Sequence, residues 1–232
     1  MDRSLELQAN LQDVEREISD ACLAANRNRA EVTLIVVTKT WPATDVDLLA
    51  DLGIADVGEN RDQEAKPKRD EVKAKNLRWH AIGQLQTNKA KSVATWADVV
   101  HSVDRIDLVT ALTKAVVGRE VPLDVLIQIN LDANPTENRG GALPSELPSL
   151  AELISSCDGL RLQGVMGVAP LGGDDARAFS HLQDSASHIQ SSYPEANWIS
   201  AGMSGDFATA LKYGATHLRI GSSILGNRGF QG

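Results

Sequence analysis

A lysine follows a strongly apolar stretch near the start of the chain, and its position is the first sign of chemistry. Residues 33–39 read Thr-Leu-Ile-Val-Val-Thr-Lys and end on Lys39. An apolar, β-branched run of this length is typical of a strand buried on both faces. A lysine at the mouth of such a strand is costly to bury unless a ligand or a reaction uses its amine. The hypothesis is that Lys39 forms a Schiff base.

Two runs rich in glycine and serine lie far downstream and suggest what the lysine would hold. Residues 200–205 read Ser-Ala-Gly-Met-Ser-Gly, and residues 220–223 read Ile-Gly-Ser-Ser. Each run precedes an expected helix, where N–H groups and hydroxyls suit an anion, although ordinary turn and N-cap roles would explain either run alone. Phosphate sites beside Lys39 indicate a phosphorylated aldehyde held as an imine. Pyridoxal 5′-phosphate (PLP) carries both groups.

The elements that must position these residues alternate between strand and helix along the chain. Repeated βα units imply parallel pairing with right-handed crossovers, and eight of them imply an α/β fold of the (β/α)8 TIM-barrel type. An open doubly wound sheet is the structural alternative. A periodic apolar face predicts an extra N-terminal helix over residues 2–25, and the prediction is a single domain over residues 1–232. The expected strands are 33–39, 56–60, 77–83, 99–103, 123–130, 160–166, 198–201 and 216–220.

Active sites of such barrels lie at the carboxyl ends of the strands, and phosphate often binds after strands seven and eight. Arg219, on the eighth strand, would point into the barrel mouth and could donate to the pyridine nitrogen of PLP. Because arginine stays protonated, that nitrogen would remain unprotonated. The alternative is an ion pair between Arg219 and an Asp or Glu of the barrel floor. His80, on the third strand, would either pack near the ligand or serve as a hydrogen-bonded core histidine.

Composition and motifs exclude several other classes of function. The net charge of −8 argues against nucleic-acid and anionic-membrane partners. No apolar leader and no apolar run of about 20 residues are seen, which predicts a cytoplasmic protein without a membrane span. No HxH or HExxH spacing predicts a metal site. The basic residues between 66 and 75 alternate with acidic ones and indicate a solvated helix face. Monomer is the default expectation, since no long apolar surface helix indicates an interface.

Several motifs together resemble the pyridoxal phosphate homeostasis proteins, which have the fold of the N-terminal barrel of alanine racemase. These are Val-Thr-Lys-Thr at 37–40, Gly-Glu-Asn at 58–60, Trp-His-Ala-Ile-Gly-Gln-Leu-Gln-Thr-Asn-Lys at 79–89, His-Ser-Val-Asp-Arg at 101–105, Gly-Met-Ser at 202–204 and Arg-Ile-Gly at 219–221.

The resemblance covers essentially the whole chain and has implications for fold, site and role. It implies a protein that binds and buffers PLP in vitamin B6 homeostasis, without established catalytic turnover. The site residues that it implies are Lys39 as the imine lysine, Met203, Ser204, Gly221 and Ser222 around the phosphate, Arg219 facing the pyridine nitrogen, and Asn60 and His80 lining the pocket.

One departure from the family and two alternative functions stay open. After the fifth strand the family often has a lysine where this chain has Arg139, which cannot form an imine. The leading hypothesis is a PLP carrier, with apo PLP-dependent enzymes as candidate partners, because no second domain is expected to supply an acid or base to the far face of the imine. The alternatives are a weak PLP-dependent amino-acid racemase or lyase, and a Schiff-base aldolase that uses Lys39 on a sugar phosphate without PLP.

Overall fold

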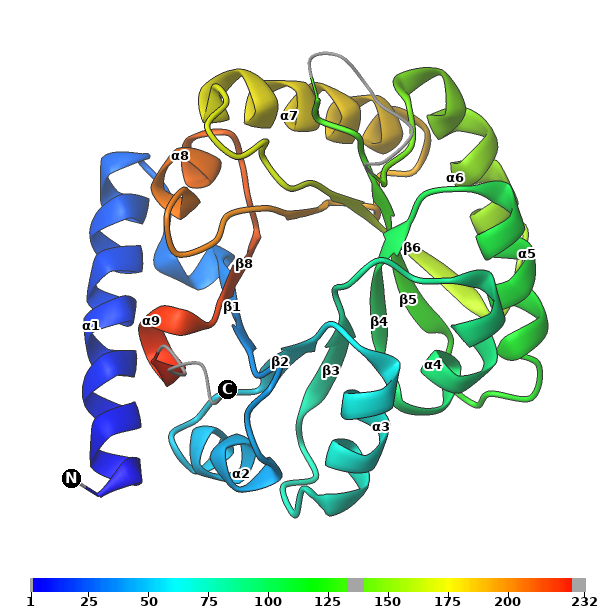
Figure 1. The fold of residues 1–232 in the computed structure, drawn as a ribbon. Coiled ribbons are helices and arrows are strands. Elements are labelled where there is room, and N and C mark those ends of the chain that lie inside the picture. Colours follow the sequence, from blue (N-terminus) through cyan, green and yellow to red (C-terminus); the bar gives the residue numbers. More distant parts are fainter. Residues whose placement is uncertain (1, 133–139, 227–232) are drawn as a thin grey trace.

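Eight parallel strands close into one barrel in the computed structural model, which describes residues 2–132 and 140–226 (Figure 1). Strand β8 pairs with β1, so the predicted (β/α)8 fold is confirmed and the open sheet is excluded. The strands are β1 (Thr33–Val37), β2 (Asp56–Glu59), β3 (Arg78–Ala81), β4 (Val99–Val103), β5 (Leu123–Gln128), β6 (Leu160–Met166), β7 (Trp198–Ser200) and β8 (His217–Ile220).

Helices surround the barrel because each strand places apolar side chains on its outer face. On β5, for example, Leu123, Val125 and Ile127 are fully buried in the layer between strands and helices. Such alternation is what a strand with two different faces requires. The helices are α1 (Arg3–Ala24), α2 (Ala43–Asp51), α3 (Asp62–Glu71), α4 (Ala90–Trp96), α5 (Ile106–Ala115), α6 (Leu147–Ser155), α7 (Asp175–Ser192), α8 (Phe207–Lys212) and α9 (Ser222–Leu225), with 3-10 turns at Arg29–Glu31, Thr87–Lys89 and Pro144–Glu146.

Helix α1 is the predicted N-terminal addition, and it lies outside the barrel against α8 and α9 (Figure 1). Its buried side chains recur every three or four residues, as the apolar pattern predicts. Asn10 Nδ2 donates to the carbonyl of Ile224, and Arg3 Nη2 donates to the carbonyl of Leu225, at 2.9 and 3.0 Å. Helix α1 is therefore fastened to α9.

The barrel interior is polar over much of its cross-section. Val99, Leu126 and Met166 form a small apolar cluster inside it. Other positions on β3, β4, β7 and β8 carry ionisable or hydroxyl groups that are almost completely buried. Buried polar groups of this kind require hydrogen-bond partners. The residues are His80, His101, Ser200, His217 and Arg219.

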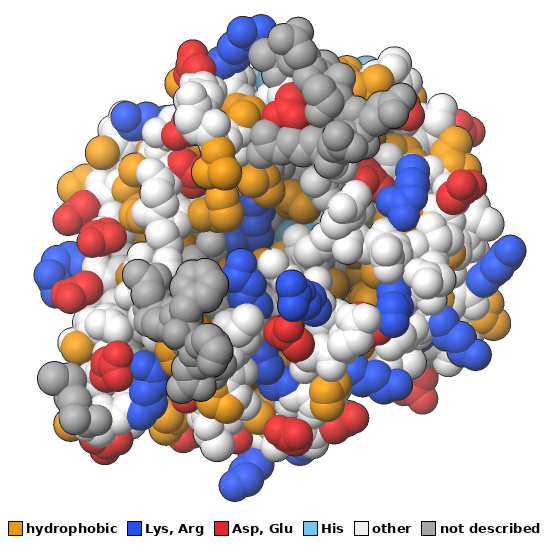
Figure 2. All heavy atoms as spheres, in the orientation of Figure 1, with side chains coloured by type: hydrophobic (Ala, Val, Ile, Leu, Met, Phe, Trp, Pro, Cys, Tyr) orange, Lys and Arg blue, Asp and Glu red, His pale blue; other side chains and the backbone are white. Residues whose placement is uncertain are grey.

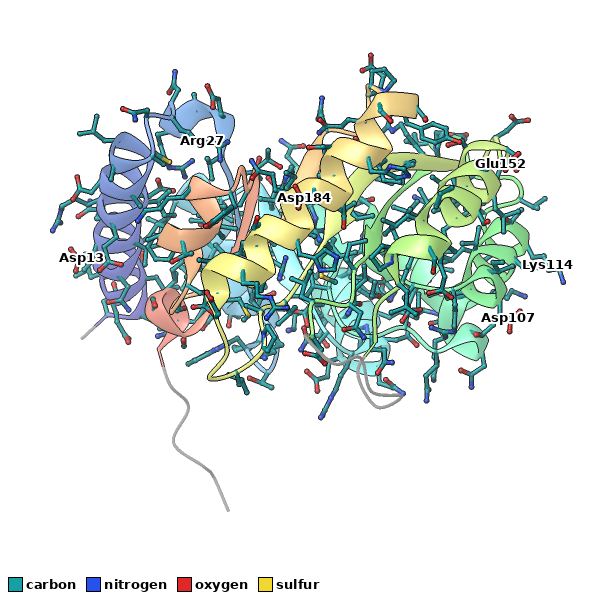
Figure 3. All side chains as sticks on the ribbon, turned by 90° about the horizontal axis from the view of Figure 1, so that it is seen from above. Asp13, Arg27, Asp107, Lys114, Glu152 and Asp184 are labelled. Atoms are coloured by element: carbon teal, nitrogen blue, oxygen red, sulfur yellow. The ribbon has the colours of Figure 1, made fainter. Side chains whose placement is uncertain are left out.

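Charged side chains are spread over the outer helices rather than gathered at one place. Figure 3 shows this for Asp13 on α1, Lys114 on α5, Glu152 on α6 and Asp184 on α7, all of which point away from the barrel. Among the residues that the structure describes, no helix is both long enough and apolar enough to cross a membrane.

Candidate functional site at the mouth of the barrel

Lys39 lies in a tight turn just beyond β1. The sequence predicts a strand up to residue 39, but β1 ends at Val37, because Trp41 N–H donates to the carbonyl of Thr38 and closes a turn there. Lys39 is exposed, so the expected cost of burying it does not arise. Its amine makes no hydrogen bond or ion pair with any residue in the described part of the chain. Thr40 has a φ of 66°, a conformation that is strained for a β-branched residue.

A buried ion pair fixes the start of this turn. Lys68 Nζ lies 2.5 Å from Glu59 Oε1 and donates to the carbonyl of Thr38 at 2.8 Å, while Thr38 Oγ1 donates to the same Glu59 oxygen. Burial raises the pKa of Glu59, with Lys68 acting in the opposite direction. The prediction of a fully solvated α3 is therefore wrong at Lys68, which is 8% exposed. The other carboxylate oxygen of Glu59 has no hydrogen-bond partner among the described residues.

The two glycine- and serine-rich loops meet the same end of the barrel. Met203, Ser204 and Ser222 are all exposed. The N–H groups of Ser222 and Ser223 donate to no other described residue, whereas Met203 N–H donates to the Asp206 carboxylate at 2.6 Å. The loop after β8 thus offers N–H groups and hydroxyls to an anion, and the loop after β7 offers the Ser204 hydroxyl.

Arg219 is buried in the interior just below these loops. Its Nη1 donates to Ser200 Oγ at 2.6 Å and its Nη2 donates to the carbonyl of Gly167 at 2.9 Å. Within residues 2–132 and 140–226 no carboxylate forms an ion pair with it, so the alternative of a partner in the barrel floor does not hold. Burial lowers the pKa of Arg219 to about 10, opposed by the charge of Asp206. The guanidinium still carries its proton at neutral pH.

His80 and Asn60 occupy very different environments. His80 is fully buried, and its Nε2 lies 2.8 Å from Asp56 Oδ1 while its Nδ1 lies 2.8 Å from His101 Nε2. This is the geometry of a hydrogen-bonded core histidine. Asn60 is exposed directly after β2, where its backbone lies against Gly83. The contacts of Asp56 with His80 and of Lys68 with Glu59 were not predicted, since Asp56 reads only as the first residue of the second strand and Lys68 as part of a solvated helix.

A cleft of about 300 Å³ opens on the β3, β5 and β6 side of the mouth. Figure 2 shows a hollow at the centre of this face in which Lys, Arg and His side chains are visible, whereas the described part of the cleft lining itself carries none of these. The cleft is lined by apolar groups and by side-chain amides, and its described lining contains no titratable residue. The lining residues include Ile82, Gln84, Gln128, Asn130, Gly140 and Met166.

Two further expectations concern metal ions and the loop after β5. Among the described residues no three His, Cys, Asp or Glu side chains are grouped as metal ligands. Arg139 lies outside the described residues, so its role stays a prediction.

The family model described as alanine racemase, N-terminal domain, matches residues 10–229. The pyridoxal phosphate homeostasis protein of Mycobacterium leprae is 38% identical over 97% of this chain and 94% of its own length. The protein of the same name from Escherichia coli K12 is 34% identical over 95% of this chain and 96% of its own.

Solved structures agree with these sequence matches. The structure of PipY from Synechococcus elongatus with PLP bound superposes with a TM-score of 0.76, at 29% identity, over 90% of this chain and all of PipY. Alanine racemase from Corynebacterium glutamicum superposes with a TM-score of 0.70 over 95% of this chain and 60% of its own, at 13% identity, which supports the fold alone. By its sequence matches along almost its whole length, the chain belongs to the alanine racemase N-terminal domain family and, within it, to the pyridoxal phosphate homeostasis proteins.

Proposed function

We propose that this protein binds PLP reversibly at the mouth of the barrel and serves as a PLP carrier in vitamin B6 homeostasis. The observation that carries the proposal is the convergence of three groups on one end of the barrel: the free amine of Lys39, the Ser222 loop and the buried guanidinium of Arg219. The PLP bound in PipY and the names of the homologues support it.

The residues present suit each part of PLP. The exposed Lys39 amine would attach to the aldehyde carbon with release of one water. Addition of a water molecule would reverse the attachment and free the aldehyde. The N–H groups of Ser222 and Ser223, with the hydroxyl of Ser204, would bind the phosphate. Met203 and Gly221 would shape these two loops. Asn60 would line the edge of the pocket. The buried His80 would lie beneath the pocket and contribute through its hydrogen bond with His101.

Arg219 would face the pyridine nitrogen and donate a hydrogen bond to it. Because the pKa of Arg219 stays at about 10, the guanidinium keeps its proton and the ring nitrogen stays unprotonated at neutral pH. An unprotonated ring withdraws electrons weakly, and PLP supplies its usual chemistry, which is electron withdrawal, less effectively in that state. This favours holding the ligand over transforming it.

The cleft beside the proposed ligand also favours a carrier over an enzyme. Racemisation or lyase chemistry needs a positioned acid or base near the reacting carbon. The described lining of the cleft supplies amides such as Gln84, Gln128 and Asn130 instead. A weak racemase or lyase remains the second candidate, because fold relatives include alanine racemase and D-threonine aldolase. Incubation of the PLP-loaded protein with amino acids in heavy water separates the two: steady α-proton exchange would contradict the pure carrier.

Borohydride reduction followed by peptide mass spectrometry tests the proposal directly. The purified protein mixed with PLP should turn yellow, and reduction should fix a pyridoxyl group on Lys39. Lys39→Ala should stay colourless, whereas Lys91→Ala, which removes an exposed lysine on α4, should behave as wild type. A colourless wild-type protein would overturn PLP binding. An adduct of a sugar phosphate on Lys39, without a pyridoxyl group, would favour an aldolase.

The carrier role itself is tested by transfer. The loaded protein, as a monomer, would pass PLP to an apo PLP-dependent enzyme faster than an equal concentration of free PLP, and enzyme activation timed after mixing measures this. Sedimentation equilibrium checks the monomer. Activation no faster than with free PLP would restrict the role to storage.

A further inference from the structure

A continuous line of hydrogen bonds crosses the barrel interior beneath the proposed site. Arg219 Nη1 lies 2.6 Å from Ser200 Oγ, which lies 3.0 Å from His101 Nδ1. His101 Nε2 in turn lies 2.8 Å from His80 Nδ1. His80 Nε2 reaches Asp56 Oδ1 at 2.8 Å. Five strands, β8, β7, β4, β3 and β2, thus contribute to one chain of polar groups that runs from the mouth to the first residue of β2.

The two ends of this chain determine the direction of every bond in it. Arginine can only donate, and a carboxylate can only accept. Asp56 accepts from the Nε2–H of His80, so a neutral His80 must accept at Nδ1. At the other end Ser200 accepts from Arg219 and gives its hydroxyl proton to His101 Nδ1. His101 must then carry its proton on Nε2 and donate it to His80 Nδ1.

The last link follows in the same way. His80 is left with its proton on Nε2 and donates it to the Asp56 carboxylate. Reversing the order would give Ser200 two donors and leave its own proton without an acceptor among the described residues.

Electrostatics support a neutral imidazole at both His80 and His101, the two residues in the middle of the chain. Burial lowers the pKa of His80, although Asp56 acts to raise it. Burial and the neighbouring His80 and Arg219 together hold the pKa of His101 well below its ordinary value. A neutral imidazole has one donor and one acceptor nitrogen, which is what each position in the chain requires.

Neighbouring charges do not compete for these links. Arg78 is paired with Asp124, and His217 Nδ1 lies 2.8 Å from Thr216 Oγ1. Two nitrogens of Arg219 are held by different partners: Nη1 donates to Ser200 and Nη2 donates to the carbonyl of Gly167. These two bonds fix the plane of the guanidinium.

We infer that Ser200, His101, His80 and Asp56 form a donor chain of fixed direction that positions Arg219 for the ring of the bound ligand. Ser200 is the positioning residue that touches Arg219, and Asp56 supplies the terminal acceptor. For the ligand this inference rests on the proposed function, but the proton arrangement belongs to the protein alone.

Nitrogen-15 NMR of the ligand-free, full-length protein tests the proton arrangement. Long-range imidazole correlations, assigned with single His→Gln variants, should show His80 and His101 as neutral tautomers with the proton on Nε2 at pH 7. A proton on Nδ1 of either ring, or a doubly protonated ring, would overturn the inference. This measurement needs no PLP, so it stands even if the protein fails to bind PLP, which would defeat the proposed function alone.

Ser200→Ala tests the positioning role, and the chain supplies a matched control. Ser102 on β4 is also a fully buried serine, but its hydroxyl has no hydrogen-bond partner among the described residues. Ser200→Ala should weaken PLP binding about tenfold, should shift the absorption band of the loaded protein, and should move the Nδ1 signal of His101 while His80 keeps its tautomer. Ser102→Ala should leave all three unchanged. Equal behaviour of the two variants would contradict the positioning role.

Discussion

Gly221 lies directly against Val37, so closely that a Cβ at position 221 would come within 3.0 Å of the Val37 carbonyl oxygen. Val37 is the last residue of β1 and stands two positions before Lys39, while Gly221 begins the loop that carries Ser222. The absence of a side chain at position 221 therefore brings the proposed phosphate loop and the lysine turn together.

Gly221→Ala is expected to push the Ser222 loop away from β1 and to weaken PLP binding about tenfold, which corresponds to about 1.4 kcal/mol. The binding of pyridoxal, which lacks the phosphate, should change less. Absorbance titration with both ligands measures the difference. Gly173→Ala is the control, because a Cβ there would be equally crowded, at 3.1 Å from the Pro170 carbonyl oxygen, but on the loop before α7. A similar loss of PLP affinity in both variants would contradict the argument.

Lys68→Met should lower the free energy of unfolding by about 3–5 kcal/mol, because it leaves the buried Glu59 carboxylate without its cation. The double variant Lys68→Met/Glu59→Leu should recover most of this loss, since neither charge then remains. Urea denaturation at pH 7 measures all three proteins. Lys66→Met, an exposed site on the same helix, should stay within about 0.5 kcal/mol of wild type. A wild-type-like Lys68→Met would show that the ion pair is dispensable.

The stability of the protein should fall as the pH drops from about 6.5 toward 4. Burial lowers the pKa of His217 to about 3, whereas an unfolded histidine takes up its proton near pH 6.5. Between these values the unfolded state binds the extra proton, so acidification favours unfolding, by up to about 1.4 kcal/mol per pH unit for a single histidine. The buried His80 and His101, whose pKa values are also lowered, act in the same direction.

Replacing His217 by Gln should make this pH dependence shallower. Replacing His188, an exposed histidine on α7, should leave the dependence as it is. Urea midpoints measured between pH 4 and pH 7 give the three slopes. Equal slopes for wild type and His217→Gln would mean that His217 is protonated in the folded protein.

Arg3→Ala should weaken both the fold and the binding of PLP. Arg3 Nη2 contacts Asp45 Oδ2 at 2.7 Å, its guanidinium stacks over Trp41 at 4.5 Å, and it donates to the carbonyl of Leu225. It therefore connects the segment after Lys39 with the helix that begins at Ser222. Hydrogen bonds from a charged group of this kind contribute about 1.5–3 kcal/mol.

The expected result for Arg3→Ala is a stability loss of about 2 kcal/mol and a severalfold weaker affinity for PLP. Arg16→Ala, on the exposed face of α1, is the control, because among the described residues Arg16 pairs with Asp13 alone, at the surface. Thermal unfolding and absorbance titration measure the two effects. A loss of stability with unchanged affinity would indicate that α1 supports the fold but not the site.

The sequence allows the fold to be predicted because eight apolar runs alternate with amphipathic helices at regular intervals. It also places Lys39, Ser204, Ser222 and Arg219 at strand ends, and parallel strands in a closed barrel bring such ends to one face. These inferences need only the order of the elements.

The interior network depends on register, which the order of the elements does not determine. His80 meets His101 because β3 and β4 are neighbours in a register that pairs His80 with Val99, two residues before His101, and Asp56 is reached because it begins the strand on the other side of β3. Lys68 is similar: its charged neighbours are solvated, and only the packing of α3 against β2 shows that it reaches Glu59. The spacing of histidines on successive strands was the one available signal.

The attachment of α1 to α9 has a consequence for the order of events during synthesis. Arg3 and Leu225 are 222 positions apart, and β1 obtains one of its two neighbours only when β8 is made. Until β8, α8 and α9 have been made, one edge of β1 stays open and α1 lacks most of the surface that it covers, which is the kind of distant pairing that slows folding. The mouth of the barrel, where PLP is proposed to bind, is thus completed only after β8 has been made.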